Sequence, residues 1–183
     1  LNDLDDPKKR ELLELVDPFT YRDSLDLPKL IVVGTNDPYW PVDAANLYID
    51  DLPGYSAMVY APNAGHGTEV YRVTQAIQGM ISHLNTGLEF PSIEIFLEET
   101  ASNVKISLNV DERDSKLVEL RLFHSLSAVR DFRKAFFEYE TIGKEEEIIV
   151  DRVSFNAFYI EGVFTFNGKE LLISTPVKVI EAP

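Results

Sequence analysis

Hydrophobic positions along the chain follow two different patterns, and the change falls near Gly87. Before it, two short and continuous apolar runs, residues 30–33 and 57–61, are flanked by Pro and Gly. An uninterrupted apolar run of this length between such residues is typical of a buried strand. Residues 42–52 and 68–84 instead carry apolar side chains at helical spacing, so a predicted helix follows each run.

The two predicted helices begin with residues that favour helix starts. Pro41 precedes the first helix and suits an opening helical turn, and Thr68 is a candidate N-cap of the second. The order strand, helix, strand, helix predicts a parallel sheet with crossover helices, although two strands alone do not make a stable sheet. The second helix carries one apolar stripe, formed by Val70, Val73, Ile77, Ile81 and Leu84.

After Gly87 the pattern changes to short strands with turn residues about every ten positions. The pair Asn167-Gly168 is the clearest turn signal, because both central residues of a type I′ hairpin need positive φ. We therefore expect an α/β part over residues 1–87, followed by an antiparallel, immunoglobulin-like β-sandwich over residues 88–183. The predicted strands of the sandwich cover residues 93–97, 104–110, 117–123, 136–142, 148–150, 155–166 and 171–180.

Composition excludes several classes of protein. Of the 183 residues, 45% are hydrophobic and 26% are charged, which is an ordinary globular balance. No apolar run approaches the roughly 20 residues that a membrane-spanning helix needs. A net charge of −14 repels phosphate backbones, so we expect no nucleic-acid partner. The absence of cysteine excludes disulfides, thiolate catalysis and cysteine-ligated zinc.

Candidate chemistry lies directly after the two predicted parallel strands. Asp37 follows the first strand, and His66 follows the second within Asn63-Ala64-Gly65-His66-Gly67. Open α/β sheets bind ligands at the carboxyl ends of their strands, so these side chains are expected to lie within hydrogen-bond distance. An Asp that holds one imidazole nitrogen lets the other accept a proton from a nucleophile. The alternative is a capping Asp and a loop His that is satisfied locally.

At these residues the chain resembles the PhoPQ-activated pathogenicity-related proteins, densely over residues 17–67 and loosely over residues 117–137. That family is similar to α/β-hydrolases with a small C-terminal β-sandwich. The resemblance implies that residues 1–87 are the C-terminal βαβα portion of an α/β-hydrolase sheet, with Asp37 as the triad acid and His66 as the triad base. The resembling segments include Asp17-Pro18-Phe19-Thr20-Tyr21-Arg22, Gly34-Thr35-Asn36-Asp37-Pro38-Tyr39-Trp40, Asp51-Leu52-Pro53-Gly54, Pro62-Asn63-Ala64-Gly65-His66-Gly67 and Arg130-Asp131-Phe132-Arg133.

The nucleophile of such a triad is not found in this sequence. In α/β-hydrolases the serine lies on a glycine-flanked elbow well before the acid. The single serine before Asp37 is Ser24, which has no Gly-x-Ser-x-Gly context and no predicted strand before it. We therefore expect the C-terminal portion of a hydrolase, whose partners are the missing N-terminal portion or a second copy of the chain.

Other candidate residues have structural interpretations. His83 and His124 are expected to be structural, and no spacing typical of a metal site appears, so neither a metal nor a cofactor is expected. Tyr39 and Trp40 either form the wall of a substrate pocket or are buried against the sheet edge. The two arginines of Arg130-Asp131-Phe132-Arg133 either pair with the hydrolase part or clamp a carboxylate.

The function expected from these features is acyl hydrolysis of an ester or peptide, with the serine supplied from elsewhere. The alternative is a non-catalytic interaction protein that keeps the hydrolase shape and binds through its sandwich. The resemblance implies a secreted or periplasmic location. A serine on an upstream elbow would distinguish the enzyme from the interaction protein.

Overall fold

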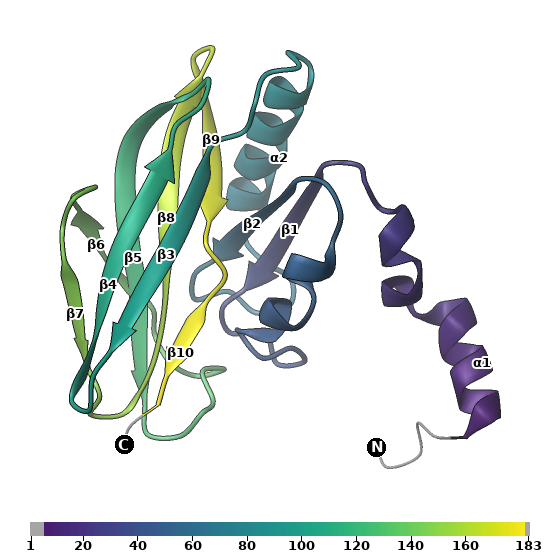
Figure 1. The fold of residues 1–183 in the computed structure, drawn as a ribbon, viewed down its shortest axis with the longest axis horizontal. Coiled ribbons are helices and arrows are strands. Elements are labelled where there is room, and N and C mark those ends of the chain that lie inside the picture. The colour runs from purple at the N-terminus through teal and green to yellow at the C-terminus, as the bar shows by residue number, and fades with distance from the viewer. Residues whose placement is uncertain (1–5, 182–183) are drawn as a thin grey trace.

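The structure is a computed structural model that describes residues 6–181. Strands contain 40% of the residues and helices 22%, so the molecule is mostly β. The N-terminal helices α1 (Pro7–Val16) and η1 (Pro18–Ser24) extend away from the two sheets (Figure 1). The remaining elements are β1 (Lys29–Gly34), η2 (Ala44–Leu47), η3 (Ile49–Asp51), β2 (Ser56–Ala61), α2 (Val70–Leu84), β3 (Ser92–Glu99), β4 (Asn103–Asp111), β5 (Lys116–Ser127), β6 (Glu138–Ile142), β7 (Ile148–Asp151), β8 (Phe155–Phe166), β9 (Lys169–Ser174) and β10 (Lys178–Ile180).

Two sheets enclose the main core. The larger one has seven strands in the order β1-β2-β9-β8-β5-β6, with β10 pairing with β8. The smaller one has the order β3-β4-β7 and lies over β5 and β8 (Figure 1). Alternate residues of β4, β5 and β8 face each other between the sheets, including the fully buried Val104, Ile106, Phe158 and Ile160.

The prediction that residues 1–87 form part of a parallel α/β-hydrolase sheet is wrong. Strands β1 and β2 are parallel, with Gly34 opposite Ala61, but no third parallel strand joins them within residues 6–181. Instead β2 pairs with the antiparallel β9 at Met58 and Ser174, so the parallel pair extends one sheet of the sandwich. The pairing gives β2 a neighbour on both edges, and its apolar residues 57–61 are buried. The sheet is mixed rather than parallel.

Both predicted helices of the first part differ from expectation. Residues 42–52 form the two short 3₁₀ turns η2 and η3, although Val42 and Ala45 are buried as the spacing suggested. Thr68 does not cap α2, because its φ of 51° is left-handed and the N-cap is Glu69. Helix α2 therefore begins later than predicted, at Val70.

The apolar stripe of α2 mostly faces outward. The face of α2 that packs on the sheet contains Ala76, Gly79 and Met80. The helix lies so close to β9 that a Cβ at Gly79 would be 2.5 Å from the carbonyl oxygen of Glu170. Close approach to β9 selects this face over the more apolar one. The exposed stripe residues are Val70, Ile77, Ile81 and Leu84.

The strands predicted after Gly87 are confirmed, with one division. Asn167 and Gly168 have φ of 47° and 71° and form the predicted tight turn between β8 and β9. The last predicted strand is split into β9 and β10 at Pro176, which cannot donate to a ladder. Strands β1 and β2 share a sheet with β8 and β9. The division into two domains at Gly87 stays a prediction.

Candidate functional site

Asp37 and His66 lie in the two loops that follow β1 and β2. These strands are parallel and in register, so their carboxyl ends meet at one edge of the sheet. Asp37 Oδ2 lies 2.8 Å from His66 Nδ1. The contact predicted from the sequence is therefore confirmed, while a catalytic role for the pair stays a prediction.

Backbone groups fix the carboxylate of Asp37. Its Oδ1 accepts hydrogen bonds from the N–H groups of Tyr39, at 2.8 Å, and Trp40, at 3.3 Å, and the residue is only 5% exposed. Oδ2 is then directed to His66, whose Nδ1 donates to it and whose Nε2 remains available. The ring of Tyr39 packs edge-on against the imidazole at 4.9 Å between centroids.

The two loops approach each other so closely that the residue at the end of β1 must be glycine. A Cβ at Gly34 would lie 2.4 Å from the carbonyl oxygens of both Ala64 and Gly65. The N–H of Asn36 donates to the Ala64 carbonyl at 3.0 Å, and Thr35 Oγ1 accepts from the N–H of Asn63 at 2.7 Å. We call residues 35–43 the acid loop and residues 62–69 the histidine loop, and these bonds hold the two loops together.

The protonation of Asp37 should be visible in the stability of the protein. Burial works to raise the pKa of Asp37, but hydrogen bonds from Tyr39, His66 and Trp40 outweigh it and hold the pKa below its ordinary value of 3.8. Because its pKa is lower in the folded state, the ionised Asp37 stabilises the fold at pH values above about 3.8. This contribution is lost as the pH falls through the folded-state pKa.

We therefore expect Asp37→Asn to flatten the acid side of the stability profile. Urea denaturation between about pH 6 and pH 2.5 measures the free energy of unfolding, which should fall less steeply below about pH 4 in the variant. Equal slopes in the two proteins would show that the carboxylate is not held in this way.

Two cavities adjoin Asp37. One, of about 360 Å³, lies against β1 and is lined by His66 and Thr68. The other, of about 250 Å³, lies between residues 37–43 and residues 130–133. Trp40 lines both cavities and Tyr39 lines the second, with exposed fractions of 61% and 72%. The alternative that these two side chains are buried against the sheet edge is wrong.

Neither cavity is lined by a serine. Thr68 Oγ1, the hydroxyl nearest to His66 in sequence, donates to the carbonyl of Gly67 at 2.8 Å. Within residues 6–181 the contact with Asp37 is the one hydrogen bond of the His66 imidazole. Within the described part of the chain, an acid and a histidine thus lie together, with no serine in the two cavities beside them.

The other histidines lie away from this site. His83 is fully buried in α2 and stacks on Phe90 at 3.9 Å between ring centroids, and His124 lies within β5. In the part of the chain that is described, no three His, Asp or Glu side chains gather closely enough to hold a metal ion. None of the described helices is long and apolar enough to cross a membrane.

Two asparagines at the site were not singled out from the sequence. Asn36 donates to the carbonyls of Phe132 and Ala135, and Asn63 exchanges two hydrogen bonds with the backbone of Phe137. Both asparagines lie in the short motifs that contain Asp37 and His66. Their position beside the candidate residues is the sequence feature that indicates a role at the site. Arg130 pairs with Asp43 at 2.5 Å, as one of the two interpretations predicted, and Arg133 pairs with Asp131.

Comparisons with known proteins place the chain in a family. No curated protein matches it. Among solved structures, the third fibronectin III domain of human KIAA0343 protein is similar over 49% of this chain and 78% of that domain, with 12% identity and a TM-score of 0.31. The family of the PhoPQ-activated pathogenicity-related protein matches residues 1–133, a range that includes both site loops and ends in the β5–β6 connection. Since the match spans more than half of the chain, the protein belongs to the PhoPQ-activated pathogenicity-related protein family.

Proposed function

We propose that Asp37 and His66 are the acid and the general base of an acyl hydrolase. The observation that carries this proposal is the 2.8 Å contact between Asp37 Oδ2 and His66 Nδ1. A buried carboxylate that accepts from Nδ1 fixes the imidazole tautomer with a lone pair on Nε2. His66 then removes the proton from an attacking hydroxyl, and Asp37 stabilises the imidazolium that forms.

The attacking serine comes from residues outside this chain in our proposal. The cavities at Asp37 contain no serine, and Nε2 of His66 has no partner within the described residues. The serine attacks an ester or peptide carbonyl, and His66 returns the proton to the leaving group. The same serine-free cavities also fit a second candidate, an interaction protein that keeps the acid and histidine without turnover.

This chain alone should not react with a serine-directed fluorophosphonate. Because an activated hydroxyl is needed for phosphonylation, we expect no stoichiometric adduct by intact-mass spectrometry after prolonged incubation. A serine hydrolase treated in parallel controls for reagent quality. A single stoichiometric adduct that is lost in His66→Gln would show that the chain contains its own nucleophile and would overturn the proposed external serine.

A further inference from the structure

The connection between β5 and β6 is built into the site. We call residues 128–137 the sandwich loop. Asn36 Nδ2 donates to the carbonyls of Phe132, at 2.9 Å, and Ala135, at 2.7 Å. Asn63 Nδ2 donates to the carbonyl of Phe137 at 2.9 Å, and the N–H of Phe137 donates to Asn63 Oδ1 at 2.7 Å. One loop of the sandwich is therefore bonded to both the acid loop and the histidine loop, which fixes its position relative to them.

Packing strengthens this attachment. Phe132 and Phe137 are 5% and 2% exposed, and they belong to the core that also contains Tyr60 of β2 and Tyr159 of β8. The rings anchor the backbone of the sandwich loop, while the charged side chains between them project to the surface. A side chain on this loop has a defined distance from Asp37, which a mobile loop would not provide.

The cavity of about 250 Å³ lies between the sandwich loop and the acid loop. Its lining includes the exposed Tyr39 and Trp40 and the arginines Arg130 and Arg133. It also includes Asp37, Asp43 and Asp131, each of which already has a partner, His66, Arg130 and Arg133 in turn. Ligand pockets for whole molecules usually enclose about 300–1,000 Å³, so this cavity suits one group of a substrate. Exposed aromatic rings and arginines in the lining of one cavity suit a planar group that bears a negative charge, which must take over one of these arginines from its internal carboxylate.

The sandwich loop is locally basic in an acidic protein. It contains Arg130, Arg133 and Lys134 against the single acid Asp131, while the whole chain has a net charge of −14. An anionic ligand is repelled by most of the surface, and the sandwich loop offers it a basic contact beside the candidate site. Arg130 is already held from two sides, by Asp43 at 2.5 Å and by Glu181 at 3.4 Å.

Arg133 has the partner that is easiest to replace. Among residues 6–181 its side chain bonds only to Asp131, two residues away, with Nη2–Oδ2 at 2.6 Å and Nε–Oδ1 at 3.0 Å. The two side chains are 58% and 40% exposed, and solvent screens such surface pairs, so the pair contributes little to stability. A ligand carboxylate can take over the same two-point geometry at little cost, because the guanidinium fork fits it equally well.

We propose that this cavity recognises a carboxylate on the substrate, through Arg133, with Tyr39 and Trp40 packing on the planar group that bears it. This inference rests on the proposed function, and it adds the chemical class of the substrate: an ester or amide with a free carboxylate. We choose a carboxylate over a phosphate because it has the same charge and shape as the Asp131 carboxylate that it would replace on Arg133.

The test is a binding titration of this chain with benzoate. Trp40 is the one tryptophan of the sequence, so its fluorescence reports directly on the cavity. We expect saturable binding of benzoate, and binding of the neutral isostere benzamide that is about 10-fold weaker or more, as for loss of a charged hydrogen bond. Arg133→Gln should weaken benzoate binding by the same factor and leave benzamide binding unchanged.

A matched control is Arg113→Gln, since Arg113 pairs with Asp111 and Glu89 on the sandwich, outside the cavity. It should bind benzoate as the unaltered chain does. Equal binding of benzoate and benzamide, or unchanged benzoate binding in Arg133→Gln, would overturn the proposal, as would phenyl phosphate binding about 10-fold more tightly than benzoate. Binding needs no nucleophile, so these results are independent of whether His66 acts in hydrolysis.

Discussion

His66→Gln is expected to lower kcat for ester hydrolysis by about 10⁴- to 10⁶-fold in the protein together with the residues that supply its nucleophile. The imidazole acts only as the proton moves, so KM should change little. Glutamine keeps a polar side chain in the exposed loop but cannot accept the proton from a hydroxyl. Initial rates with an activated ester measure the effect.

Asp37→Asn should have a smaller effect on kcat, of about 10⁴-fold. The amide can still accept from the N–H groups of Tyr39 and Trp40, so the loop keeps its shape. It no longer stabilises the imidazolium, and it favours the wrong imidazole tautomer.

His124→Gln is the matched control for these kinetics, because His124 lies in β5 and lines neither cavity at Asp37. Its kcat should equal that of the unaltered protein. A loss of less than about 10-fold in His66→Gln would reject the general-base role and favour the interaction protein.

The acid and histidine could be located from the sequence because their positions depend on local features. Each follows a short apolar run that ends in a small residue, Gly34 or Ala61, and two parallel strands in register bring their following loops together. Local signals also sufficed for the turn at Asn167 and Gly168. In each case the residues that determine the structure are adjacent in the chain.

The rest of the fold depends on contacts between distant segments, which have no periodic signal. The pairing of Met58 with Ser174 turns an isolated parallel pair into an extension of the sandwich. Gly79 then decides which face of α2 meets β9, against the direction of the apolar stripe. Likewise, the bonds from Asn36 and Asn63 to the sandwich loop join side chains to backbone groups far along the chain. Sequence spacing carries no information about such partners.

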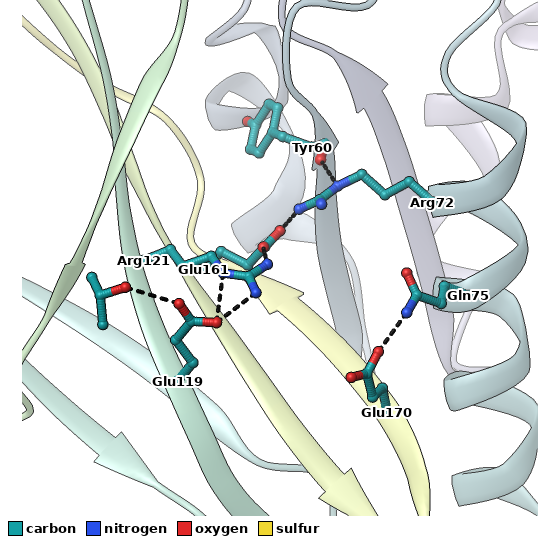
Figure 2. A network of polar contacts seen from close by, with 8 residues as sticks. Tyr60, Arg72, Gln75, Glu119, Arg121, Glu161 and Glu170 are labelled. Carbon is teal, nitrogen blue, oxygen red and sulfur yellow. Dashed lines mark hydrogen bonds and ion pairs between the residues drawn. The ribbon is translucent and has the colours of Figure 1, made fainter.

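The largest expected effect on stability comes from a buried chain of charges beneath α2. Glu161 of β8 is fully buried and lies between Arg72 of α2 and Arg121 of β5 (Figure 2). Arg72 Nε also donates to the carbonyl of Tyr60 at 2.6 Å, and Arg121 Nε donates to Glu119 at 2.9 Å. Two guanidinium groups from different elements thus share one carboxylate in the interior.

Glu161→Gln should lower the free energy of unfolding by about 3–5 kcal/mol, because it leaves Arg72 as a buried charge without its counter-ion. Arg72 has a side chain that is only 12% exposed, and burial already lowers its pKa. Arg121 is affected less, since it keeps Glu119. Urea denaturation measures the change as a lower midpoint with an unchanged slope.

Glu170→Gln is the matched control, because Glu170 also contacts α2, through Gln75, but is exposed on β9 (Figure 2). Its stability should change by no more than about 0.5 kcal/mol.

A double variant, Arg72→Met with Glu161→Leu, removes both buried charges together and should recover most of the lost stability, since apolar side chains of similar size replace a buried ion pair at little cost. If the double variant is instead as unstable as Glu161→Gln, its loss comes from the severed bond between Arg72 and the Tyr60 carbonyl, a bond that Glu161→Gln leaves intact. The Arg72 side chain would then stabilise the fold through that hydrogen bond as well as through its ion pair with Glu161.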